Sequence, residues 1–137
     1  MPLSLNLLTN VVDGNALLAL QATSRTALVH QQSVMAYQLT QFDATTPTVE
    51  GGLTAVTAQL ASIGDYINSL PAGSAERRKV ELEKERLDVR QRLLSGRRET
   101  WGVVARIDLE IDMERVAAEL TALDAAIALI QARIAAL

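Results

Sequence analysis

The sequence predicts an all-α protein of three to four helices, arranged as antiparallel hairpins and ending in a long coiled-coil-type helix. Of the 137 residues, 49% are hydrophobic but only 3% are aromatic, so the core would consist of Ala, Leu, Val and Ile side chains, which suit closely packed helices. A strong turn signal at 70–74 and an unbroken heptad pattern near the C-terminal end complete the prediction. We expect an N-terminal helical hairpin at 1–70 and one structural unit at 71–137, which joins a charged helix to the heptad helix.

The N-terminal hairpin is expected to consist of a helix over 16–42 and a second helix from about 47 to 70. The sequence DATTPT at 43–48 predicts the break between them, because Pro47 suits the first turn of a helix and Thr46 can cap it. The second helix carries an apolar stripe with alternating steps of four and three residues, which indicates packing on a partner. The stripe consists of Val49, Leu53, Val56, Leu60, Ile63 and Ile67.

The stretch Leu70-Pro71-Ala72-Gly73-Ser74 is the strongest turn signal in the chain, and Ser74 can cap the charged helix that follows it. Ser95-Gly96 either ends this charged helix or lies inside a longer one as a weak point. An apolar residue recurs every seven positions in this helix, while charged residues occupy most of the positions between. The recurring residues are Val80, Leu87, Leu94 and Trp101.

The segment RIDLEIDME at 106–114 alternates apolar and acidic residues, which alone is typical of a half-buried strand. From Leu109 onward, however, apolar residues step by four and three without interruption, and this pattern favours a helix through Leu109. Ile107 and Ile111 then form a second apolar face on the same turns, so more than one neighbour should bury this part of the helix. A short extended stretch is the alternative near 101–107, where Gly and Val are poor helix formers.

The heptad helix is the predicted oligomerisation element. Four heptads of apolar a and d positions favour self-association into a coiled coil, and the pattern extends to the last residue, where a bare apolar end would be costly in water. The alternative is that this helix packs inside the chain's own helical domain, and the lone tryptophan could equally belong to that core. The predicted interface residues are Leu109, Met113, Val116, Leu120, Leu123, Ile127, Ile130, Ile134, Leu137 and Trp101.

Charge is segregated in the C-terminal half: residues 76–98 carry nine basic and five acidic side chains, whereas 99–124 carry two basic and seven acidic ones. The basic block is a possible contact for nucleic-acid phosphates. Interleaved acids, an overall net charge of −3 and the absence of aromatic residues for base stacking favour a solvated helix face instead. The possible nucleic-acid contacts are Arg77, Arg78, Lys79, Arg86, Arg90, Arg97 and Arg98.

The sequence contains no recognisable catalytic, cofactor-binding or metal-binding constellation. On a helix, the pairs Asp108/Asp112 and Glu110/Glu114 lie on opposite faces and do not converge on one ion. His30 has no acidic residue nearby in the sequence, and no Gly-rich phosphate loop is present. Because the chain has no cysteine, disulfides and thiolate chemistry are excluded. We therefore predict that the protein is not an enzyme and uses no cofactor or metal.

These features predict a structural, self-assembling helical subunit or adaptor of a larger particle, such as a bacteriophage virion or a tail- or injection-type assembly. Its partners would be further copies of the chain and other protein subunits. The alternative is a nucleic-acid-binding helical module that uses 77–98, and a third possibility is an amphipathic protein that engages membranes. No signal peptide and no membrane span are expected, so the chain would be soluble or part of a particle.

Overall fold

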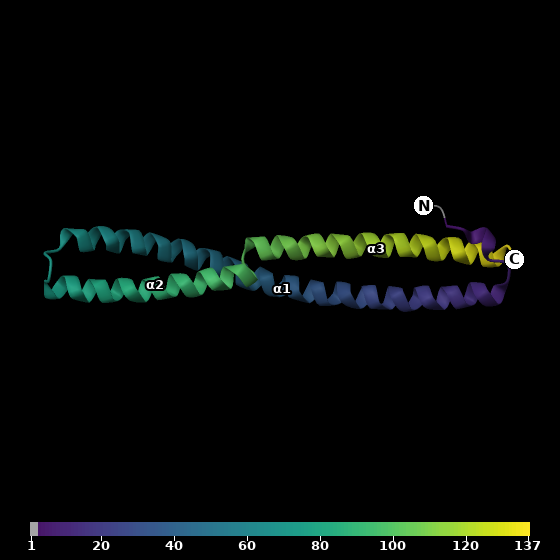
Figure 1. The fold of residues 1–137 in the computed structure, drawn as a ribbon, viewed down its shortest axis with the longest axis horizontal. Helices are drawn as coiled ribbons and strands as arrows, with labels where there is room; N and C mark the ends of the chain where they lie inside the picture. The colour runs from purple at the N-terminus through teal and green to yellow at the C-terminus, as the bar shows by residue number, and fades with distance from the viewer. Residues whose placement is uncertain (1–2) are drawn as a thin grey trace. The chain divides into compact units, whose positions relative to one another are not determined.

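The computed structural model describes residues 3–137, and this part of the chain is all-α with no strand. A short 3-10 helix, η1 (Leu5–Leu7), precedes three α-helices, α1 (Val11–Ser69), α2 (Ala75–Trp101) and α3 (Val103–Ala135) (Figure 1). Only Gly102 separates α2 from α3, so together they form one long helix that is bent at this residue. The all-α prediction is confirmed. Over residues 3–137, α1 is one long helix and α2 and α3 together count as a second one bent at Gly102, so there are two long helices instead of three to four.

The predicted break at 43–48 is wrong, because α1 continues through it and contains Pro47 in its interior. Phe42, Thr46 and Val49 are all buried, whereas Pro47 is exposed. These buried positions keep the four-and-three spacing of the following stripe, and packing along this line therefore continues across the proline. A proline inside a helix removes one backbone hydrogen bond and crowds the preceding turn, but here the packing on both sides keeps the segment helical. No hairpin forms within 1–70.

The chain divides into two compact units, and each pairs one part of α1 with a later part of the chain. Unit 1 contains the described residues up to Gln38 together with Glu110–Leu137, and unit 2 contains Leu39–Leu109. The predicted boundary at 70/71 coincides with the turn between α1 and α2, and this turn lies inside unit 2.

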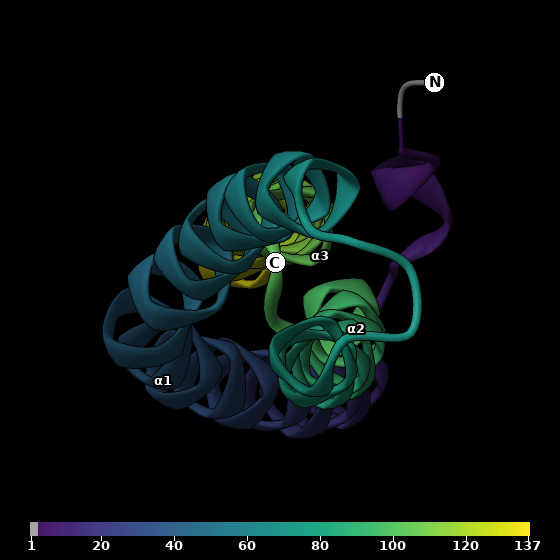
Figure 2. The same ribbon diagram turned by 90° about the vertical axis from the view of Figure 1, so that its left-hand side faces the viewer.

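Unit 2 is an antiparallel hairpin in which α2 lies beside the C-terminal part of α1, and Figure 2 shows the turn that joins them. Ser74 is the N-cap of α2, as predicted: its side-chain oxygen accepts a hydrogen bond from the Arg77 backbone N–H at 3.1 Å. Gly73 in the same turn has a φ of 74°, which favours glycine. α2 does not end at Ser95-Gly96, so this pair lies inside the longer helix.

Unit 1 pairs the first part of α1 with α3, again in antiparallel orientation (Figure 1). Close packing is evident at Gly14, where an added Cβ would lie 2.5 Å from a side-chain carbon of Ile134. Arg25 forms an ion pair with Asp124 at 2.7 Å, and this hydrogen-bonded carboxylate raises the pKa of Arg25. The alternating segment 106–114 lies within α3, so both the strand pattern and the alternative of an extended stretch near 101–107 are wrong. Only Gly102 there has an extended backbone.

Candidate interaction surfaces

The inner seam of α3 is the side of the helix that carries the predicted interface residues up to Ile134. In unit 1 this side packs on α1, and Val116, Leu120 and Ile130 are buried within the single chain. The remaining seam positions from Leu109 to Ile134 are half-buried, and only Leu137 of the predicted set is exposed. The single chain thus already covers much of the seam, and its contact with another chain stays a prediction. The inner seam consists of Leu109, Met113, Val116, Leu120, Leu123, Ile127, Ile130 and Ile134.

Trp101 lies in unit 2, in contact with α1. Its ring centroid is 5.0 Å from that of Phe42, and the two ring planes are tilted by 53°. The Trp101 carbonyl accepts a hydrogen bond from the Thr46 hydroxyl at 2.8 Å, which satisfies the buried polar side chain at that position. These contacts make Trp101 part of the packing between α1 and the end of α2.

Glu50 holds the junction between α2 and α3. One carboxylate oxygen accepts hydrogen bonds from the Arg98 guanidinium at 3.0 Å and from the Val103 backbone N–H at 3.3 Å. The second bond places a negative charge at the N-terminus of α3, where the helix dipole favours it. This role of Glu50 was not predicted from the sequence. Its only signal is that it is the single charged residue between 44 and 64.

Gly102 is buried at this junction, and there is no room for a side chain at this position. A Cβ there would collide with the Arg98 carbonyl oxygen and lie 2.6 Å from the Arg98 Cγ. The backbone is extended, with a φ of −82° and a ψ of −176°, which any residue can adopt. The constraint at this position is therefore steric.

A second heptad-spaced line of apolar residues, here called the outer stripe, runs along α3 in unit 1 on the side away from the inner seam. All of its members are exposed, and Ile111 and Leu129 each have 53% of their surface accessible. Arg115 occupies the one heptad position between Ile111 and the first alanine. From the sequence, only Ile111 of this line was predicted to lie on a second apolar face, because most of its other members are alanines, which carry little hydrophobic signal. The outer stripe consists of Ile111, Ala118, Ala122, Ala125, Leu129 and Ala132 in α3 and of Ala136 directly after it.

The exposed side of α1 in unit 1 is also poor in charge. Between residues 14 and 38 the only charged side chain is Arg25. Val34 and Tyr37 are exposed there, and so is His30. Helix surfaces that face water normally carry many charged residues, so this composition is unusual for a solvated face.

The predicted nucleic-acid contacts fall into two groups. Arg77 and Arg98 are ion-paired within the chain, to Glu81 at 3.1 Å and to Glu50 at 3.0 Å, and Arg78 donates to the Gly73 carbonyl at 3.2 Å. The other four are exposed, and their spacing of seven, four and seven residues places them on one side of α2. None of these four forms an ion pair within residues 3–137. We call Lys79, Arg86, Arg90 and Arg97 the basic face.

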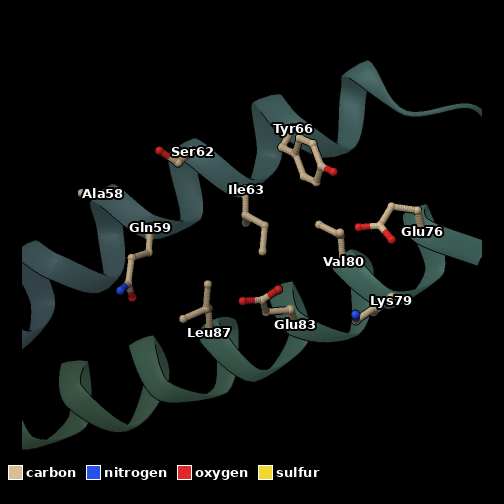
Figure 3. A pocket seen from close by; sticks show the side chains of 10 residues that line it. All are labelled: Ala58, Gln59, Ser62, Ile63, Tyr66, Glu76, Lys79, Val80, Glu83 and Leu87. Atoms are coloured by element: carbon tan, nitrogen blue, oxygen red, sulfur yellow. The ribbon is translucent and has the colours of Figure 1, made fainter.

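A groove of about 640 Å³ lies between α1 and α2 in unit 2. Figure 3 shows that Ile63, Val80 and Leu87 point toward one another across it, while Tyr66 and Glu83 lie along its edge. The lining residues from α1 are uncharged, whereas the charged ones, Glu76, Lys79 and Glu83, all come from α2. The other rim residues are Ala58, Gln59, Ser62, Glu76 and Lys79.

Within residues 3–137, no group of three or more His, Cys, Asp or Glu side chains is arranged to hold a metal ion. Over the same residues, no helix is long and apolar enough to cross a membrane. Comparisons of the chain with family models, with curated proteins and with solved structures found no match.

Proposed function

We propose that the protein is a structural helical subunit that assembles with further copies of itself through the C-terminal heptad helix. The observation that carries this proposal is the exposed outer stripe of α3. The inner seam is already packed on α1, yet a second heptad-spaced apolar line remains in contact with solvent. A helix that is apolar on two sides requires a neighbour on each of them. Within residues 3–137, α1 supplies only one of these neighbours.

The charge-poor side of α1 in unit 1 supports the same role. Exposed apolar surface that is contiguous on a folded domain marks a site of protein interaction. Val34 and Tyr37 on α1, together with Ile111 and Leu129 on α3, expose bulky apolar groups on both helices of unit 1. We therefore propose that other subunits cover this unit in the assembled state. Membership in a virion or a tail-type particle stays a prediction from composition.

The test is the solution mass of the full chain, measured by light scattering over a range of concentrations. We expect a mass above that of one chain, which is 14.8 kDa. A mass equal to one chain at every concentration would overturn the proposal.

A double variant separates the two sides of α3. Leu123→Asp with Ile127→Asp places two charges in the inner seam, which packs on α1. We expect this variant to lose helix content by circular dichroism, because buried unpaired charges are strongly destabilising. If it instead remains helical and becomes a monomer, the inner seam is the contact between chains.

A second candidate function is nucleic-acid binding through the basic face. Four exposed cationic side chains without an ion pair lie on one side of α2, and Glu83 is the acidic residue that accompanies them. Binding through phosphate contacts weakens steeply with salt. Titration of random duplex DNA at rising salt, with Arg86→Gln, Arg90→Gln and Arg97→Gln combined as the variant, tests this function. Absence of binding at low salt would eliminate it.

A further inference from the structure

We infer that a second copy of the chain covers the outer stripe, with the two α3 helices antiparallel and a two-fold axis between Ala122 and Ala125. This inference rests on the proposed function and gives the contact an orientation and a register. A two-fold contact is the commonest type between identical subunits, because one surface then serves both partners. Such a contact requires the outer stripe to fit against a second copy of itself that runs in the opposite direction.

The side-chain sizes along the outer stripe meet that requirement. With the axis between Ala122 and Ala125, these two alanines face each other across the contact. Leu129 then faces Ala118 of the second copy, and Ile111 faces Ala136 of the second copy. Each large side chain thus meets a small one, and large residues opposite small ones allow two helices to interdigitate. The small central residues also allow the backbones to approach closely.

Charge favours the same orientation. The acids of the flanks are concentrated in the first part of the stripe, at Asp112, Glu114 and Glu119. In a parallel pair Glu114 would lie beside Glu119 of the second copy, and this like-charge contact is unfavourable. In the antiparallel register Asp112 faces Arg133 of the second copy, and the other two acids face alanines.

Arg115 is compatible with this register. It lies on the line of the stripe, opposite Ala132 of the second copy, and its guanidinium is already 3.1 Å from the Asp112 carboxylate of its own helix. Because that ion pair draws the charged group to the side, its aliphatic stem can cover the small alanine while the charge stays in water.

Spin-label distances test orientation and register directly, since the chain has no cysteine that would interfere. We choose Thr121→Cys and Ala135→Cys, two exposed positions on the same edge of the outer stripe. In the inferred register the two labels at 121 are offset by about 7 Å along the helix, and those at 135 by about 35 Å, at 1.5 Å per residue. The prediction is a short distance at 121 and a long one at 135. Dilution with unlabelled chain confirms that the distances are intermolecular.

Each other outcome has a definite meaning. Short distances at both positions would indicate a parallel pair and overturn the inference. Long distances at both in a chain that is oligomeric would place the contact elsewhere, for example on α2, and would also overturn it. A monomeric chain would overturn the proposed function as well, and light scattering distinguishes that case from the first two.

A charge-swap pair tests the central contact. Ala122→Glu alone and Ala125→Lys alone should each weaken association at least tenfold, because each places unpaired charges at the axis. Mixed together they should associate again, since Glu at 122 then faces Lys at 125. Gln131→Glu, which adds one acid at an exposed position away from the outer stripe, should associate like the parent. If the mixture does not associate while both variants keep their helix content, the register is wrong.

Discussion

At the scale of single residues, the junction between α2 and α3 depends on Gly102 and Glu50. Gly102 is buried against the Arg98 backbone, and Glu50 bonds both helices at the point where they meet. From the sequence, Gly102 was identified only as a poor helix former, and Glu50 stands out only as the single charged residue between 44 and 64. Their shared position arises only when α1 lies beside the junction. Long-range contacts of this kind cannot be deduced from local spacing.

The first prediction concerns Gly102→Ala. The added Cβ has no room, so we expect the free energy of unfolding to fall by about 1–3 kcal/mol, the usual cost of overpacking. Urea denaturation followed by circular dichroism measures the change.

Gly96→Ala is the matched control, because nothing lies within 4 Å of a Cβ at that exposed position of α2. Replacing a helical glycine with alanine there should raise stability by up to about 1 kcal/mol. Equal effects of the two substitutions would contradict the steric account of Gly102.

At the scale of elements, what could be predicted depended on how far each apolar pattern extends. The inner seam of α3 continues without interruption, and the helix was predicted through the alternating acids at 108–114 for that reason. The pattern of α1 was interrupted by Thr46, a polar residue in a buried position, and the adjacent Pro47 then resembled a helix start. Tertiary packing of Phe42 and Val49 overrode that local signal. The outer stripe was missed for a different reason, because its alanines are compatible with both water and a helix contact.

Gly102 also corrects the phase of the heptads in the second long helix. The repeat that ends with Leu94 and Trp101 would continue at 108, 112 and 115, whereas the inner seam of α3 uses 109, 113 and 116. The difference is one residue. An extended residue between the helices accommodates this shift, and the apolar side on each part of the helix can then face its own stretch of α1.

The second prediction therefore concerns deletion of Gly102. Removing this residue brings both repeats into one phase, so a continuous helix becomes compatible with the apolar pattern. We expect the deletion variant to keep its helix content and to be more stable than Gly102→Ala in urea denaturation. If the deletion variant is less stable than the alanine variant, the extended residue at 102 stabilises the fold by more than the alignment of the two heptad repeats.

At the scale of the whole molecule, the chain has more apolar helix surface than its own fold covers. The central claim is that further copies of the chain cover the outer stripe. The outer stripe is flanked by acids at one end and is nearly free of charge at the other. An antiparallel contact therefore depends little on ion pairs, and high salt should not dissociate the assembly. We expect the mass at about 1 M salt, where charge interactions are largely screened, to equal or exceed the mass at low salt. A fall to one chain would indicate a contact dominated by ion pairs.

One measurement tests the central claim most directly: the light-scattering mass of the parent chain and of Ala122→Glu at the same concentrations. The account predicts a parent mass above 14.8 kDa and a variant that is fully helical with the mass of one chain. A parent that is a monomer, or a variant that assembles like the parent, would contradict it.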